Sequence, residues 1–396
     1  MRGSGEGRLK DILDAASARC FFFGTGDAAQ SLCQANIPYG LAKIAWAQRR
    51  LGLPEDASFI SAPDTTVSRN IERWADGFGY GGVIQYTGDF ITLSIKSNLC
   101  GMLLVGLDEA PEPDEVLARA DRFKASEPTL DGTPIEWDLG TSNHFVNVLD
   151  LDHPLEGYRT VALLHGSGGE IRGDGPWGMG LYPAVSAPLR NAMEVLDTPW
   201  GPLRILRGDA AVEYRDGYAK IESFVHRRRE LIADTLFPGN RVLSNTTHQG
   251  SRSAGDYNLG CLVEPPGTVV PVALRAELPV AMVRVRPNLS EAALARAGVR
   301  ERAERTGMLD RLGAANILPH GGGYAYAQFS GVRRVIELED RRYFEMEPAA
   351  GTQRELIHNV RGLPFAYRGE EVIQTLEDWD MGEVVARGTP RTVWMV

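Results

Sequence analysis

Five residues that could bind a metal or attack phosphorus lie in short segments rich in glycine or hydroxyl side chains. They are four of the seven histidines and one of the four cysteines: Cys100, His144, His165, His248 and His320. Neutral imidazole and thiolate are strong ligands for divalent transition metals. Glycines beside them let backbone N–H groups approach an anion. The pattern predicts a metal site with a histidine nucleophile next to it.

A structural interpretation of the same residues competes with this prediction. A single buried histidine is most often a hydrogen-bonded residue of the core, and a single buried cysteine packs as a small hydrophobe. The spacings of dozens of residues match no compact zinc signature such as Cys-x-x-Cys. Spacing alone therefore leaves both interpretations open, and the order and context of the segments favour the metal site.

The segments follow one another in a distinctive order. They are Ala62-Pro63-Asp64, Leu99-Cys100-Gly101-Met102, Asn143-His144-Phe145, His165-Gly166-Ser167-Gly168-Gly169, His320-Gly321-Gly322-Gly323 and Pro364-Phe365-Ala366-Tyr367-Arg368. In this order they resemble segments of the RtcB-type RNA ligases, manganese enzymes that join RNA ends through a guanylylated histidine. The family counterparts are Met-Pro-Asp, Asp-x-Gly-Cys-Gly-Met, Asn-His-Phe, His-(Ser/Thr)-Gly-Ser-Arg-Gly, His-Gly-Ala-Gly-Arg and a C-terminal strand. The resemblance covers residues 20 to 396.

The resemblance implies a role for each matched residue. Cys100, His144, His165 and His248 would bind one or two Mn²⁺ ions, with the thiolate bridging two. His320 would take GMP from GTP and pass it to an RNA 3′-phosphate or 2′,3′-cyclic phosphate, which is then joined to a 5′-hydroxyl, as in tRNA splicing and RNA repair. The implied nucleotide- or substrate-binding residues are Asn143, Asp64, Gly321, Gly322 and Tyr367.

Several positions depart from the family pattern. Ser97 replaces the acidic metal ligand, so the second Mn²⁺ site is in doubt unless Asp64, Asp89 or Asp108 completes it. Gly169 and Tyr324 stand where the family has arginines, which removes bidentate contacts to phosphate. Met395 aligns with the lysine that contacts guanine. The ligands and the nucleophile are thus kept while the nucleotide contacts are reduced, which predicts a divergent member with an altered substrate.

Two further functions remain open. One is a metal-dependent hydrolase without a covalent nucleotide, in which His320 serves as acid or base. The other is a non-catalytic paralogue that binds a metal or a nucleotide. The three hypotheses differ in whether a nucleotide becomes attached to His320.

Composition indicates a folded enzyme with a modest affinity for nucleic acid. The chain has 396 residues, 43% of them hydrophobic, and a net charge of −10. The arginine runs Arg227-Arg228-Arg229 and Arg341-Arg342 are interpreted as a solvated helix face and a loop. The expected partners are a nucleotide and RNA ends or a smaller phosphorylated acceptor, bound by a monomer.

The four cysteines form no disulfide pattern, and no signal or membrane segment is evident, so we expect a cytoplasmic protein without membrane contact.

The hydrophobic pattern predicts an α+β fold of mixed sheets flanked by helices, with the metal site at the centre. Residues 1–19 are expected to form a flexible extension, and residues 20–396 a single catalytic domain with a helical insertion near 288–315. The remaining expected helices are 39–51, 114–125 and 209–236, and the expected strands are 82–86, 90–95, 102–107 and 160–164.

Overall fold

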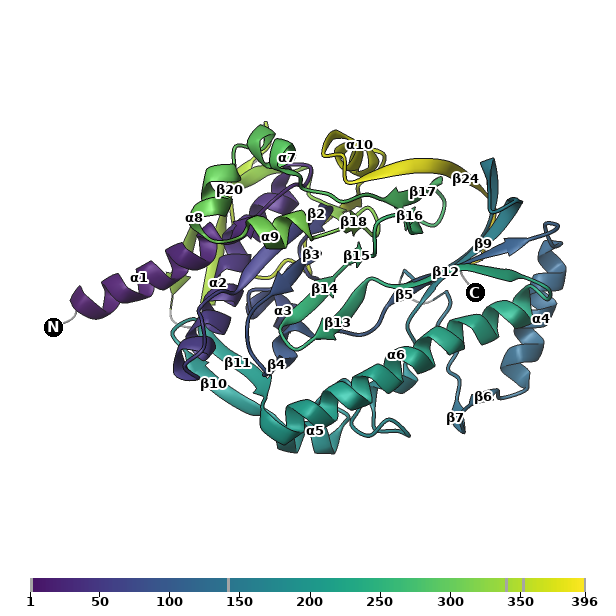
Figure 1. Cartoon of the computed structure of the whole chain (residues 1–396), viewed down its shortest axis with the longest axis horizontal. Helices are drawn as coiled ribbons and strands as arrows, with labels where there is room; N and C mark the ends of the chain where they lie inside the picture. Colours follow the sequence, from purple (N-terminus) through teal and green to yellow (C-terminus); the bar gives the residue numbers. More distant parts are fainter. Residues whose placement is uncertain (1–2, 141–142, 339–340, 351–352, 395–396) are drawn as a thin grey trace.

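A seven-stranded antiparallel sheet forms one half of the molecule (Figure 1). The computed structural model describes residues 3–140, 143–338, 341–350 and 353–394. In spatial order the strands of this sheet are β12 (Arg241–Thr247), β5 (Gly101–Leu107), β9 (Tyr158–Gly166), β8 (Phe145–Leu155), β24 (Gly382–Trp394), β17 (Val280–Val285) and β16 (Val269–Ala273). Their central part is apolar on both faces, as expected for strands covered on both sides.

The two faces of this sheet bury alternate residues of each strand. In β5, Leu103 and Val105 pack in the same cluster as Ile221 of helix α6 (Gly208–Leu236). Met102 and Leu104 point the other way and pack with Met282 and other residues of β17 and β24. The sheet curls until its edge strand β16 contacts β5 and β12. The curl leaves an opening where β5 begins and β9 ends.

A five-stranded sheet with helix α2 (Ala28–Arg50) forms the other half. Its strands in order are β1 (Cys20–Phe21), β2 (Ser58–Thr66), β3 (Tyr80–Gln85), β14 (Asp256–Leu259) and β13 (Gln249–Ser253). Most of α2 is buried, and the side chain of Asp27 caps its first turn by accepting from the backbone N–H of Gln30. His248 lies between β12 of one sheet and β13 of the other, so the chain passes from half to half at a predicted metal ligand.

The remaining elements cover these two sheets. The smaller sheets consist of β10 (Glu194–Thr198), β11 (Gly201–Leu206) and β4 (Ile91–Thr92); β20 (Phe329–Leu338), β21 (Arg341–Pro348) and β22 (Glu355–Ile357); β15 (Cys261–Val263) and β18 (Ile317–Pro319); β19 (Tyr324–Ala325) and β23 (Ala366–Tyr367); and β6 (Thr129–Leu130) and β7 (Thr133–Pro134). The other helices are α1 (Gly3–Ala18), α3 (Ile71–Ala75), α4 (Pro113–Ala125), α5 (Ala187–Ala192), α7 (Glu291–Arg296), α8 (Arg300–Arg305), α9 (Leu309–Gly313), α10 (Glu371–Asp378) and the short 3₁₀ turns η1 (Leu93–Ile95) and η2 (Glu170–Arg172).

The expected α+β class is confirmed. The sheets, which were expected to mix parallel and antiparallel strands, are almost entirely antiparallel in the described part of the chain. The pairing of β1 with β2 is parallel, and the other strand pairings in the described part of the chain are antiparallel. Helices over 114–125 and 209–236 and strands over 82–86, 102–107 and 160–164 are confirmed within a few residues, and 39–51 is the second half of α2. Three short helices, α7, α8 and α9, occupy the 288–315 segment.

Two expectations about local structure are wrong. Residues 3–18, expected to be a flexible extension, form α1, because Ile12 and Ala16 find a buried place in the cluster around α2. The predicted strand over 90–95 pairs only at Ile91 and Thr92 and then turns as η1, which ends in the left-handed conformation at Lys96. In the described part of the chain, no helix has the length and apolar character needed to cross a membrane.

Candidate metal centre

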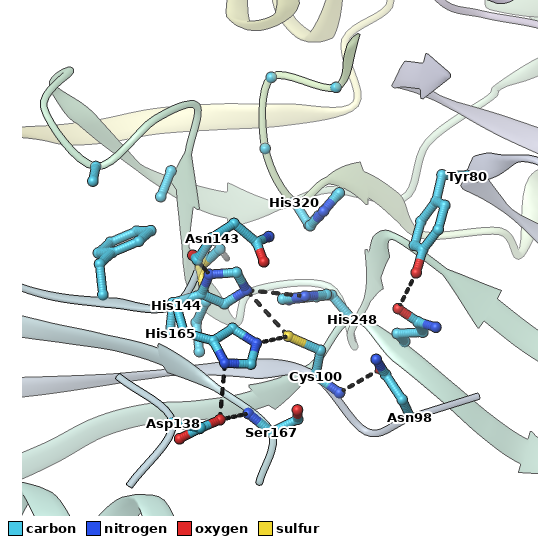
Figure 2. A pocket seen from close by; sticks show the side chains of 18 of the residues that line it. Tyr80, Asn98, Cys100, Asp138, Asn143, His144, His165, Ser167, His248 and His320 are labelled. Atoms are coloured by element: carbon cyan, nitrogen blue, oxygen red, sulfur yellow. Dashed lines mark hydrogen bonds and ion pairs between the residues drawn. The ribbon is translucent and has the colours of Figure 1, made fainter. Parts of the chain in front are cut away.

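The predicted metal ligands meet at the opening of the curled sheet, where it joins the five-stranded sheet (Figure 2). Cys100 directly precedes β5, and His165 is the next-to-last residue of the neighbouring strand β9. His144 directly precedes β8, where Phe145 pairs with His165. His248 follows β12, whose last residue pairs with Gly101. Strand register therefore brings together residues up to 148 positions apart in the chain.

The donor atoms lie at the distances that a shared ion requires. The Sγ atom of Cys100 is 3.3 Å from Nε2 of His165 and 3.5 Å from Nε2 of His144. Nε2 of His165 is 3.4 Å from Nε2 of His248. The donor atoms of Cys100, His165 and His248 all lie within 4.8 Å of one another, and the three residues are buried. His144 is partly exposed at the edge of this set.

Hydrogen bonds to the far side of two imidazole rings direct their Nε2 atoms toward the cysteine. Nδ1 of His165 is 2.7 Å from the carbonyl oxygen of Asn143, so Nδ1 carries the proton and Nε2 is the nitrogen with a lone pair. Nδ1 of His144 forms an ion pair of 2.8 Å with Oδ2 of Asp138. Such partners fix the tautomer and the ring orientation of a metal-binding histidine. Nδ1 of His248 is buried and has no hydrogen bond partner among the described residues.

The charges around Cys100 favour its thiolate. Burial would raise the pKa of Cys100, but electrostatic interactions with the imidazoles of His165, His248 and His144 and a hydrogen bond to His144 outweigh it and lower the pKa well below its usual value. Burial lowers the pKa of His248 to about 3, so this imidazole is neutral at physiological pH. Cys100 and Asp138 raise the pKa of His144 to about 10 against the effect of burial, so this imidazole would release a proton on binding a metal, whereas the thiolate of Cys100 and the neutral His248 are already in the forms that bind one.

Asp138 connects two of the ligand segments and was not anticipated from the sequence. Its Oδ2 accepts hydrogen bonds from the backbone N–H groups of Ser167 and Gly168, at 3.2 and 3.0 Å, in the loop that follows His165. The same oxygen contacts His144. Its Oδ1 accepts from the guanidinium of Arg228 at 2.8 Å. Burial would raise the pKa of Asp138, but its bonds to His144 and Arg228 hold it well below its usual range.

The arginine runs do not form the predicted solvated face and loop. Arg228 and Arg229 are 1% exposed, because α6 packs on the sheet and directs Arg229 toward Gly166 of β9 and Arg228 toward Asp138. Arg228 also binds Glu170 at 2.6 Å, whereas Arg227 remains at the surface and pairs with Asp131. Arg342 lies in strand β21, and its guanidinium stacks over the ring of Tyr39 at 4.6 Å. The sequence predicts a helix over 209–236, but only the packing of α6 shows which of its arginines face inward.

His320 is fixed by a buried carboxylate. Oδ2 of Asp64, a fully buried residue of β2, lies 2.7 Å from Nδ1 of His320 and accepts from the backbone N–H groups of His320 and Gly321 at 3.1 and 3.2 Å. The ring of His320 is 4.5 Å from that of His248, between their centroids. Burial would lower the pKa of His320, but the hydrogen bond and charge of Asp64 raise it above its usual value.

The loop after His320 has room only for glycine at two positions. A Cβ atom on Gly322 would lie 2.5 Å from the carbonyl oxygen of Arg368. Gly323 has φ +65°, and a Cβ atom there would lie 2.5 Å from the carbonyl oxygen of Asp64. The glycines let the backbone of this loop pass close to β2, which holds the carboxylate of Asp64 against His320.

One cavity of about 680 Å³ contains the metal centre and His320. It is also lined by Asn143, Gly321, Gly322 and Tyr367, which were predicted to bind the nucleotide or substrate. Asp64 lies behind His320 and acts through it. Ser97, Asp89 and Asp108 are not among the lining residues, and Asp89 and Asp108 are exposed at the surface. Met395 lies outside the described residues.

The cavity has cations that the motifs did not indicate, and aromatic rings that include the predicted Tyr367. Arg69, Arg73, Arg172 and Arg275 line it. The guanidinium of Arg69 stacks over the ring of Phe365 at 4.4 Å. Tyr367, Phe365 and Tyr324 form a cluster at the rim, with centroids 4.7 to 5.4 Å apart. An arginine and aromatic faces together suit an anionic ligand that carries a planar base.

The cavity also has an acidic side chain, Glu136, next to Gly169. A Cβ atom on Gly169, which stands in place of a family arginine, would lie 1.9 Å from Oε2 of Glu136. The space for a side chain at this position is therefore filled by a carboxylate. Phosphate binding on this side would meet a negative charge in place of a guanidinium.

The chain matches no protein-family model and no curated protein. The fold and the site define a protein with a buried cysteine–histidine cluster that could hold a metal ion, beside a carboxylate-bound histidine, in one cavity at the junction of two sheets.

Proposed function

We propose that this chain is a metal-dependent nucleotidyltransferase of the RtcB type, in which His320 carries the nucleotidyl group. The observation that supports this most is the contact between Asp64 and His320. Asp64 holds the proton on Nδ1, which leaves the lone pair on Nε2 in a cavity that also contains the metal ligands.

The proposed first step takes place at the α-phosphorus of a nucleoside triphosphate, GTP in the family. The lone pair of Nε2 of His320 forms the nitrogen–phosphorus bond, and the bond from phosphorus to pyrophosphate breaks with its electron pair on the leaving oxygen. The proton on Nδ1 of His320 remains there, hydrogen-bonded to the carboxylate of Asp64. The negative charge of this carboxylate stabilises the positive charge that forms on the ring. A divalent ion on the cysteine–histidine centre would neutralise charge that develops on the phosphate oxygens.

The second step passes the nucleotidyl group to a phosphorylated acceptor. An acceptor phosphate oxygen attacks phosphorus, the nitrogen–phosphorus bond breaks, and His320 regains its lone pair. Arg69, Arg172 and Arg275 provide positive charge for the nucleotide and acceptor phosphates, and Tyr367 offers a ring face to the base. Asn143 lines the same cavity. RNA ends are the family's acceptor, and a smaller phosphorylated molecule fits the same chemistry.

A metal-dependent hydrolase is the second candidate, and the carboxylate of Glu136 favours it. Glu136 occupies the space next to Gly169 where the family has an arginine for phosphate. In a hydrolase, the Asp64–His320 pair would move a proton to or from water, and no nucleotide would become attached to the protein.

Labelling with radioactive nucleotides separates the two candidates. The purified chain is incubated with Mn²⁺ or Zn²⁺ and α-labelled GTP, ATP, CTP or UTP in turn, and then examined on a denaturing gel. The His320→Ala variant tests the nucleophile, and His153→Ala, at an exposed position of β8, is the matched control. Label that is labile to acid and stable to alkali, present in the wild type and the control but not in His320→Ala, supports nucleotidyl transfer. No label with any nucleotide, in protein that contains the metal, rejects it.

A further inference from the structure

We propose that the centre holds a single ion of the zinc type, four-coordinated by one thiolate and three imidazoles, and that it holds no second ion. This inference rests on the metal site of the proposed function. It departs from the pair of Mn²⁺ ions that the family likeness implies. The described residues suit the first ion and do not suit the second.

The spacing of the donor atoms agrees with one tetrahedral ion. Zinc binds histidine nitrogen at about 2.0–2.1 Å and cysteine sulfur at about 2.3 Å, which places tetrahedral donors about 3.3 to 3.6 Å apart. The measured separations from Cys100 to His165 and His144 are 3.3 and 3.5 Å, and that from His165 to His248 is 3.4 Å. Small movements of the partly exposed His144 would complete the shell.

Among the described residues, the cluster of three or more potential metal ligands is Cys100, His165 and His248, and no carboxylate belongs to it. Ser97 has a neutral hydroxyl and does not line the cavity. Asp64 does not line the cavity, and its Oδ2 is bound by His320 and two backbone N–H groups. Asp108 follows the far end of β5, seven residues from Gly101, which is about 20 Å in an extended strand. Both carboxylate oxygens of Asp138 are bound, one by Arg228 and the other by His144 and backbone N–H groups.

The chemistry of the donors selects the class of ion. Manganese prefers carboxylate, carbonyl and water oxygens, whereas thiolate and imidazole suit zinc and cobalt. The cluster of Cys100, His165 and His248 contains sulfur and nitrogen but no carboxylate. Replacement of the family's acidic ligand by Ser97 removes the hard oxygen that would favour manganese.

Metal counting on the full-length chain tests this inference. The protein is stripped with a chelator, loaded separately with Zn²⁺, Co²⁺ or Mn²⁺, dialysed, and measured by elemental analysis. We expect one equivalent of Zn²⁺ or Co²⁺ per chain and loss of Mn²⁺ on dialysis. The Co²⁺ form should show the intense visible absorption of four-coordinate cobalt and a sulfur-to-cobalt charge-transfer band. Cys100→Ser should lose that band, and Cys33→Ala, a buried cysteine in the cluster around α2, should keep it.

Each other outcome overturns a stated part of the inference. Two equivalents of any metal reject the single ion, and Mn²⁺ retained as well as Zn²⁺ rejects the class of ion. A folded chain that binds no metal rejects both, and circular dichroism shows whether each variant is folded. The count is independent of histidine labelling. Two ions with labelled His320 would reject only this inference, whereas one zinc without label would reject only nucleotidyl transfer.

Discussion

Replacement of Asp138 by asparagine should weaken metal binding without any change to a ligand. Asparagine has the same shape, but one of its two terminal atoms donates where the carboxylate accepted. If its oxygen keeps the bonds to His144 and the loop after His165, its amino group faces the guanidinium of Arg228. Both groups are then donors, and Arg228, 1% exposed, keeps Glu170 as its remaining carboxylate partner.

The size of the effect follows from these contacts. A hydrogen bond to a charged group contributes about 1.5–3 kcal/mol, so loss of the bond to Arg228 should destabilise the fold by about 2 kcal/mol. Loss of a carboxylate partner of a metal-binding histidine typically reduces metal affinity about 10- to 100-fold. We therefore expect Asp138→Asn to unfold at lower urea concentration and to bind Zn²⁺ about 10- to 100-fold more weakly.

The assay is a competition between the protein and a fluorescent zinc chelator, together with urea unfolding of the metal-free chain. Asp131→Asn is the matched control, because Asp131 pairs with Arg227, the neighbour of Arg228 on α6, but lies at the surface. We expect the control to match the wild type in both measurements. An Asp138→Asn variant that binds Zn²⁺ as tightly as the wild type would refute the positioning role of this carboxylate.

Three further substitutions test other parts of the structure. Asp64→Asn should reduce labelling of His320 by about a hundredfold or more and leave the metal count unchanged, because the carboxylate holds the nucleophile and not the ion. Leu99→Gly relieves a left-handed conformation (φ +58°) but removes a fully buried side chain, so urea unfolding should show a net loss of about 1–3 kcal/mol. A gain in stability would mean that backbone strain dominates at this position. Burial lowers the pKa of Lys43 to about 8, although Asp76 opposes this. The unfolded chain then binds more protons than the folded chain between pH 8 and about 10.5, so stability should rise with pH in this window by up to about 3 kcal/mol. Lys43→Met should remove this rise in a series of urea unfolding curves, and an unchanged slope would contradict the lowered pKa.

The separate strands and motifs could be predicted because each depends on local sequence. Apolar runs such as 102–107 and 160–164 have the length of a buried strand and are short for a buried helix, and a histidine among glycines is visible without a structure. The grouping of Cys100, His165 and His248 depends on strand register, which the sequence pattern alone does not give. We expected these residues to meet only because of the resemblance to the RNA ligases.

Residues that act through packing were not predictable from the same patterns. Asp138 and Arg228 are 90 positions apart and meet only because α6 packs across β9. An arginine run looks the same in sequence whether it faces solvent or a buried carboxylate. The strand predicted over 90–95 is wrong beyond Thr92 because packing also decides there. Leu93 and Ile95 of η1 are buried by packing, although η1 pairs with no described strand.

The proposed metal ligands and the proposed nucleophile are held by different halves of the fold, and this separation has a physical consequence. Cys100, His144 and His165 stand at the ends of adjacent strands of one sheet, so their spacing is fixed by backbone pairing. His320 is held by Asp64 of the other sheet. Contacts such as the hydrogen bond of 2.9 Å from the backbone N–H of Leu99, just before β5, to the carbonyl oxygen of Gln249 in β13 bridge the junction beside His248. The arrangement allows metal binding to persist when the junction loosens, whereas reaction at His320 requires both halves in register, because a displacement of about 1 Å between reacting groups is enough to slow a reaction about a hundredfold.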